Sequence, residues 1–113
     1  MKPKTKKAIM LIILKKLELN QLVCSKDFKI DEENEGEEFI SICIDMMEKR
    51  YIEGFYPMDA TRGDDPDVLK NVEITVDGEE FLEQNSKIRK VFNLIEKGAQ
   101  PLSELVSLAV SLL

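Results

Sequence analysis

The residue types that usually carry out covalent catalysis are scarce in this chain. Its 113 residues include no His, and Cys24 and Cys43 are too far apart for a Cys-x-x-Cys redox or metal motif. The sequence has no Gly-x-Ser-x-Gly nucleophile turn and no glycine-rich loop that could cradle a phosphate. We therefore expect no enzymatic activity, no catalytic residues and no cofactor. We expect two reduced thiols, with Cys43 acting as a small core hydrophobe.

Carboxylates are plentiful, and a metal ion is the first ligand to consider for them. The segment "DATRGDDPDV", residues 59–68, carries four Asp against one Arg. It lacks the Asp-x-Asn/Asp-x-Asn/Asp-Gly start and the closing Glu of a calcium-binding loop. Gly63 and Pro66 indicate a loop between two strands. The sequence therefore predicts a solvated, acidic hairpin tip and no metal site.

A second group of acids lies on a predicted helix over residues 34–51. One half of its helical wheel is apolar and consists of Phe39, Ile40, Ile42, Cys43, Ile44, Met46, Met47 and Tyr51. The other half carries Glu37, Glu38, Asp45 and Glu48, with Lys49 as its only base. Such a face repels a polyanion and suits a basic partner. We predict that this face binds a protein, together with Asp64 and Asp65 of the loop.

The basic residues are concentrated near the two ends of the chain, although its net charge is −6. Residues 1–16 contain six Lys and no acid, whereas residues 51–85 contain ten acids and two bases. Contacts with phosphates supply most of the non-specific affinity of proteins for DNA. A basic edge therefore supports an alternative, a DNA-binding transcription regulator that uses Lys4, Lys6, Lys7, Lys87, Arg89 and Lys90. A weaker alternative is an acidic surface that mimics DNA on another protein.

The pattern of apolar residues predicts the elements that position these groups. Residues 5–18 form a helix that is apolar almost all round, so it must be the central helix. A connector follows over residues 20–31, with a short helical turn or an isolated bridge. Strands over 51–58 and 69–76 flank the acidic loop. Thr75 or Asp77 can cap the next helix, Gly98 ends a helix over 86–97, and Pro101 starts the last one. This order predicts one α+β domain over residues 1–113, mostly helical, with a two-stranded hairpin and C-terminal helices that return to the central helix.

Two stretches carry a resemblance to a known family. They are "MMEKRYIEGF", residues 46–55, and "ITVDGEEFLEQNSKI", residues 74–88. Over roughly residues 5–97 the chain resembles the YjcQ family, small winged-helix proteins of Gram-positive bacteria and their prophages. The resemblance implies a winged-helix fold and a regulatory, prophage-associated setting, and it implies no particular site. The chain departs from the family in its longer acidic loop and its apolar C-terminal helix.

The last predicted helix, about residues 101–113, is apolar over about 200° of its circumference, counting ~100° per residue. One neighbouring helix covers a stripe only about 100° wide. The excess apolar surface can pack within the chain or against a second copy. A homodimer would use Leu102, Leu105, Val106, Ala109, Leu112 and Leu113.

The N-terminal segment does not have the pattern of an export signal. Its apolar run from Ala8 to Leu14 is seven residues long and is followed by Lys15 and Lys16 instead of a small-residue cleavage site. Neither end of the chain supplies the ~20 apolar residues that a membrane-spanning helix needs. We therefore expect a cytoplasmic protein that does not enter the membrane.

Overall fold

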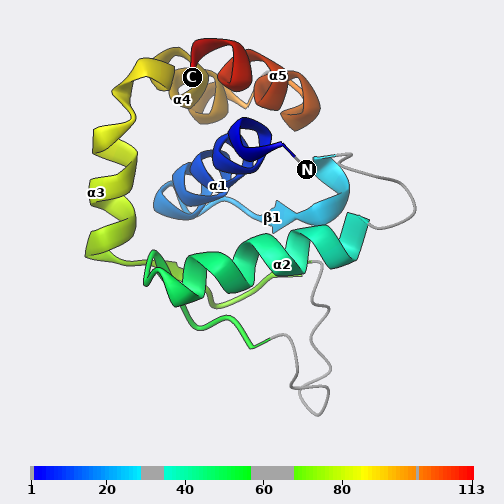
Figure 1. Cartoon of the computed structure of the whole chain (residues 1–113), viewed down its shortest axis with the longest axis vertical. Helices are drawn as coiled ribbons and strands as arrows, with labels where there is room; N and C mark the ends of the chain where they lie inside the picture. Colours follow the sequence, from blue (N-terminus) through cyan, green and yellow to red (C-terminus); the bar gives the residue numbers. More distant parts are fainter. Residues whose placement is uncertain (1, 29–34, 57–67, 99) are drawn as a thin grey trace.

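The computed structural model describes residues 2–28, 35–56, 68–98 and 100–113, and for residues 35–37 it describes the backbone alone. Helices dominate the described residues, and the strands are short (Figure 1). The elements are α1 (Pro3–Glu18), β1 (Val23–Cys24), the 3-10 turn η1 (Ser25–Asp27), α2 (Glu35–Glu48), β2 (Ile52–Glu53), β3 (Val68–Leu69), β4 (Glu73–Ile74), α3 (Val76–Gln84), the 3-10 turn η3 (Ser86–Ile88), α4 (Arg89–Lys97) and α5 (Leu102–Leu112). The predicted class, a mostly helical α+β fold with a hairpin, is confirmed.

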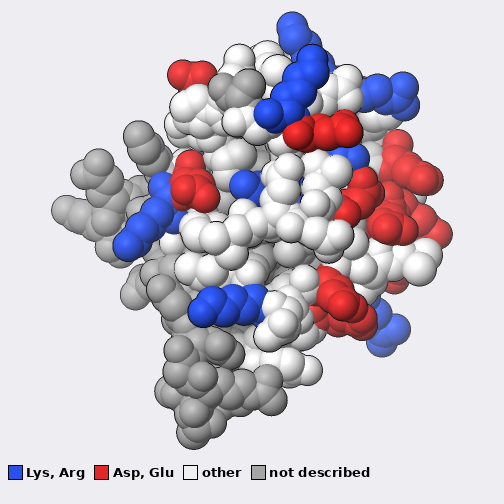
Figure 2. Space-filling model, turned by 180° about the vertical axis from the view of Figure 1, so that it is seen from behind, with Lys and Arg blue, Asp and Glu red and all other residues white. Residues whose placement is uncertain are grey.

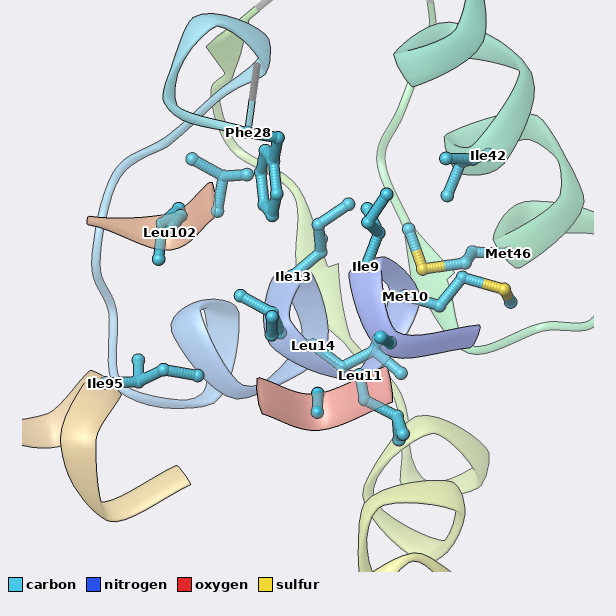
Figure 3. Packing of buried hydrophobic residues seen from close by; sticks show 14 of the residues in the cluster. Ile9, Met10, Leu11, Ile13, Leu14, Phe28, Ile42, Met46, Ile95 and Leu102 are labelled. Carbon is cyan, nitrogen blue, oxygen red and sulfur yellow. The ribbon is translucent and has the colours of Figure 1, made fainter. Parts of the chain in front are cut away.

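Helix α1 is the centre of the molecule, as its sequence predicts. Every residue from Ala8 to Leu14 is buried, because α2 covers one side of α1 and α3, α4 and α5 cover the others (Figure 1). Figure 3 shows Ile42 and Met46 of α2 pointing toward Ile9 and Met10 of α1. A helix without a polar face can be stable in water only inside such a ring of neighbours.

The hairpin forms at the base of the two predicted strands. Strands β2 and β4 are antiparallel, with Ile52 opposite Ile74 and Glu53 opposite Glu73. Strand β3 lies on the same predicted strand as β4, and it pairs with β1 of the connector. A helical turn or an isolated bridge was expected in the connector, which contains the turn η1 and, instead of an isolated bridge, the two-residue strand β1. The predicted loop over residues 59–68 lies outside the described residues except for Val68, which belongs to β3.

Several element boundaries differ from the predicted ones, and two of these differences have a clear local cause. The second strand ends at Ile74 instead of residue 76, because Thr75 caps α3: its Oγ1 accepts a hydrogen bond from the Gly78 N–H at 3.1 Å. Helix α2 ends at Glu48 instead of residue 51. Arg50 there adopts the left-handed conformation (φ 63°), its N–H bonds to the Met47 carbonyl, and the Tyr51 N–H bonds to the Met46 carbonyl. These two bonds satisfy carbonyls that the helix end leaves open.

The C-terminal helices fold back on α1, as predicted. The expected helix over 86–97 starts with the 3-10 turn η3, just after the buried Asn85, whose side-chain amide donates a hydrogen bond to the Phe81 carbonyl at 2.8 Å. Gly98 ends α4 in the left-handed conformation with φ 65°. Helix α5 follows Pro101 and packs on α1 and α4, with Leu102, Leu105 and Ala109 buried.

Candidate functional site

The outer side of α2 carries the acids for which a protein-binding role is predicted. Glu48 is exposed, and Glu38 and Asp45 are half-buried. Glu37 belongs to α2, but its side chain lies outside the described residues, as do Asp64 and Asp65. Within the described part of the chain, the predicted acidic site is thus the outer face of α2, formed by Glu38, Asp45 and Glu48.

An ion pair joins this acidic face to the N-terminal helix. The Lys6 ammonium donates a hydrogen bond to a carboxylate oxygen of Asp45, 39 residues further along the chain. The pair forms because α1 and α2 pack side by side. Both side chains are about one-third exposed, so the pair contributes less than about 1 kcal/mol to stability. The pair also reduces the charge of both predicted sites, because Asp45 of the acidic site and Lys6 of the basic site neutralise each other.

The structure does not gather the predicted basic residues into one edge. Lys4 and Lys7 are exposed on the first turns of α1. Arg89 instead lies with Lys15 and Glu18 in a groove at the other end of α1. At about 1.5 Å per residue, the distance along α1 from Lys4 to Lys15 is about 17 Å. The other two residues of the basic group, Lys87 and Lys90, are exposed and lie close to Arg89 in the sequence.

Helix α3 presents a second acidic face, which the sequence reasoning did not assign to a site. Its exposed residues include four acids and no base, and acidic side chains cover this side of the molecule in Figure 2. The acids are Asp77, Glu79, Glu80 and Glu83. On a helical wheel of residues 76–84 all four acids fall outside the buried side, so the sequence alone could have identified this acidic face.

A tight joint fixes the start of α3 against the end of α2. The Thr75 N–H bonds to the Tyr51 carbonyl at 3.0 Å, and the Thr75 hydroxyl donates to the Arg50 carbonyl. Gly78 packs directly on Tyr51: a Cβ on this glycine would lie 2.3 Å from the Tyr51 carbonyl oxygen. One turn further, the Phe81 ring stacks on the Tyr51 ring with centroids 4.6 Å apart. The two acidic helices therefore hold a fixed relative position.

Beside this joint lies a groove of about 420 Å³, and apolar side chains around it are exposed. Tyr56 is 60% exposed and Val76 is 71% exposed. Ile44, predicted on the apolar half of α2, is 39% exposed. The sequence reasoning missed these three residues. Tyr56 and Val76 fall within the strands predicted over 51–58 and 69–76. Their exposure depends on where the strands end, so the strand prediction did not indicate it.

The two cysteines differ in environment. Cys43 is fully buried in the core, as predicted, and burial raises the pKa of its thiol to about 12. At neutral pH this thiol therefore stays protonated and is a poor nucleophile. Cys24 is half-buried in β1. Among the residues that the structure describes, no group of three or more His, Cys, Asp or Glu side chains could hold a metal ion.

The residues predicted for self-association divide into two groups. Leu102, Leu105 and Ala109 are buried inside the chain, where they contribute to its own core. Val106 and Leu113 are half-buried, and Leu112 is 37% exposed. Any surface that α5 offers to a second copy must therefore consist of the latter three residues and their neighbours.

These features define a class of protein: a small, mostly helical α+β domain in which two acidic helices meet beside a hairpin. A family model described as YjcQ protein matches residues 12–98, and the chain belongs to the YjcQ family. The match ends at Gly98, where α4 ends, so α5 lies beyond it. No curated protein and no solved structure matches the chain significantly. No helix among the described residues is long and apolar enough to cross a membrane.

Proposed function

We propose that this protein is a non-enzymatic, winged-helix-like binding module that regulates a protein partner through its acidic surface. The order of α1, β1, α2, β2, β4 and α3 and the pairing of β2 with β4 support the winged-helix interpretation. In that interpretation α2 takes the place of the helix that reads DNA, and the segment between β2 and β3 takes the place of the wing. The setting would be cytoplasmic and regulatory, in a prophage or its host.

The observation that carries this proposal is the charge of α2. Glu48 is exposed and Glu38 and Asp45 are half-buried on the face that would enter the major groove, and α3 adds four exposed acids. DNA carries one negative charge per ~1.7 Å of axis, so docking in that orientation would bring like charges together. The same surface attracts a basic protein and speeds its association at low salt.

The proposal is tested by charge reversal on α2. The tagged full-length protein and its Glu38→Lys/Glu48→Lys variant would be cross-linked in the host cell and analysed by mass spectrometry. We expect a partner with a basic surface that the wild type retains and the variant loses. A Glu96→Lys/Glu104→Lys variant is the matched control, because it changes the net charge equally at exposed positions of α4 and α5, outside the acidic faces of α2 and α3. Equal recovery of the partner by all three proteins would refute a docking role for α2.

One observation favours the alternative of a DNA-binding regulator. Lys4 and Lys7 are exposed at the start of α1, where no acid occupies the first turn of the helix. They could contact phosphates in an orientation that keeps α2 away from the duplex. Binding to duplex DNA that is lost in a Lys4→Ala/Lys7→Ala variant would support this alternative. The Lys6–Asp45 pair remains intact in that variant.

A further inference from the structure

The groove beside the α2–α3 joint has the features of a docking site for a segment of another protein. It lies between the end of α2, strand β2 and the start of α3. Its volume is about 420 Å³, and its lining includes Met47, Arg50, Glu53, Tyr56, Val76 and Asp77. A volume of this size accommodates one or two large side chains of a partner.

The apolar side chains around the groove are exposed together. Of the large hydrophobic residues that are exposed in the described part of the chain, Tyr56 and Val76 line this groove. Ile44, one turn before Met47 on α2, is exposed as well, although it does not line the groove. Single exposed apolar residues are common, but a contiguous group rimmed by polar residues usually marks an interaction site.

Hydrogen bonds and close backbone contacts fix the floor of the groove. Thr75, which lines it, is hydrogen-bonded to the end of α2 through both its N–H and its hydroxyl. Gly54, also in the lining, leaves no room for a side chain, because a Cβ there would lie 2.6 Å from the Asn71 carbonyl oxygen. A preformed surface loses little conformational entropy on binding.

The charges at the rim indicate what flanks the apolar part of the partner. Glu53 and Asp77 line the groove with Arg50 as the single base among its lining residues. Glu53 is also directly opposite Glu73 in the hairpin. Like charges in opposite positions destabilise a pair of strands, and a cation held between them removes this cost.

We propose that this groove binds a segment of another protein in which large apolar side chains are flanked by Lys or Arg. The apolar side chains fill the groove against Met47, Tyr56 and Val76, and a basic side chain lies at the Glu53–Glu73 pair. This inference rests on the proposed function, because it specifies where a basic protein partner docks. It adds an apolar anchor, which the acidic face of α2 alone does not provide.

The test uses synthetic helix-forming peptides and the full-length chain. The first peptide carries Leu and a single Trp on one face and Lys on the other, and the second replaces each Leu with Ser at the same charge. The protein contains no Trp, so the emission of the peptide reports binding without background. We expect the Leu peptide to bind at least about tenfold more tightly than the Ser peptide, since apolar anchors dominate such interfaces.

Variants of the protein locate the binding site. Val76→Ser and Tyr56→Ser change exposed side chains, so the fold should persist, as checked by circular dichroism. Each should reduce the affinity for the Leu peptide by about tenfold. Glu80→Lys changes an exposed position of α3 outside the groove lining, so it should change this affinity by much less. Glu53→Lys should also weaken binding, more at low salt than at high salt.

Two results would contradict the proposal that this groove binds the apolar side chains of a partner. One is equal affinity of wild type, Val76→Ser and Tyr56→Ser for the Leu peptide, and the other is failure of the wild type to distinguish the Leu peptide from the Ser peptide. If Glu38→Lys/Glu48→Lys alone abolished binding, the groove would be wrong while the acidic docking face remained. The host-cell cross-linking tests the acidic docking face of α2 separately. If that face docks no partner, the wild type and both of its charge-reversal variants recover the partner equally.

Discussion

Substitution of Gly78 by Ala tests the joint that holds α3 against α2. Within a helix, Ala is normally more stable than Gly by about 0.5–1 kcal/mol, because Gly loses more backbone entropy on folding. Gly78 should show the opposite sign. An added Cβ would lie 2.3 Å from the Tyr51 carbonyl oxygen and 2.7 Å from Cγ1 of Ile74. The closer of these contacts is with the backbone, so relief requires α3 to move away from the end of α2.

The size of the effect follows from what that movement disrupts. Overpacking at a tight site costs about 1–3 kcal/mol. The Tyr51 carbonyl also accepts the Thr75 N–H, and a lost hydrogen bond costs a further ~0.5–1.5 kcal/mol. After the gain in helix propensity is subtracted, Gly78→Ala should destabilise the protein by about 0.5–4 kcal/mol. For a domain of this size, each kcal/mol lowers Tm by roughly 4 °C or more.

Urea unfolding followed by far-UV circular dichroism measures this difference in the free energy of unfolding. Gln84→Ala is the control, because Gln84 is exposed at the end of the same helix and its replacement should change stability by less than about 0.5 kcal/mol. If Gly78→Ala were as stable as the wild type or more stable, α3 would not pack on the Tyr51 carbonyl, and the fixed floor of the groove would be wrong.

Three further predictions concern the core and the C-terminal helix. Alkylation of the native protein at neutral pH should reach Cys24 but not Cys43. The pKa of Cys43 rises from 9.0 to about 12 on folding, so the free energy of unfolding should fall as the pH rises from 9 toward 12. This fall should be less steep in Cys43→Ala. Rapid labelling of both thiols in the native state would contradict this. Leu105→Ala removes a side chain buried between α5 and α1, so it should cost about 2–5 kcal/mol in urea unfolding; a cost below ~1 kcal/mol would mean that α5 does not pack there. In sedimentation equilibrium at tens of micromolar, we expect the full chain to form a dimer that Leu112→Glu dissociates, and a wild-type monomer would refute self-association through α5.

Local sequence signals were sufficient to predict most of the elements. The run Ala8–Leu14 is apolar in every direction, and only a central helix can bury such a run. Thr75 as a cap and Gly98 as a terminator act through their own backbone neighbourhoods, so each could be identified from a few residues. For the connector, local signals left a helical turn and an isolated bridge as alternatives, and they did not predict that β1 pairs with β3.

The candidate site was harder to predict because it depends on contacts between distant residues. Lys6 and Asp45 are 39 positions apart, and only the packing of α1 on α2 brings them together. The groove forms where the end of α2 meets the start of α3, through Thr75 and the carbonyl of Arg50. Periodicity placed Ile44 on the apolar half of its helix, but whether that edge is covered depends on neighbours that a helical wheel does not contain.

The most direct test of the central claim is a titration of the full-length protein into labelled random-sequence duplex DNA at low salt, on the order of 50 mM. The acidic faces of α2 and α3 predict no detectable binding at tens of micromolar protein. The Glu38→Lys/Glu48→Lys variant shows that the assay is sensitive, because removing acids from α2 and adding lysines there should produce salt-dependent binding. Tight binding by the wild type that weakens steeply with salt and disappears in Lys4→Ala/Lys7→Ala would contradict the account and identify a DNA-binding regulator instead.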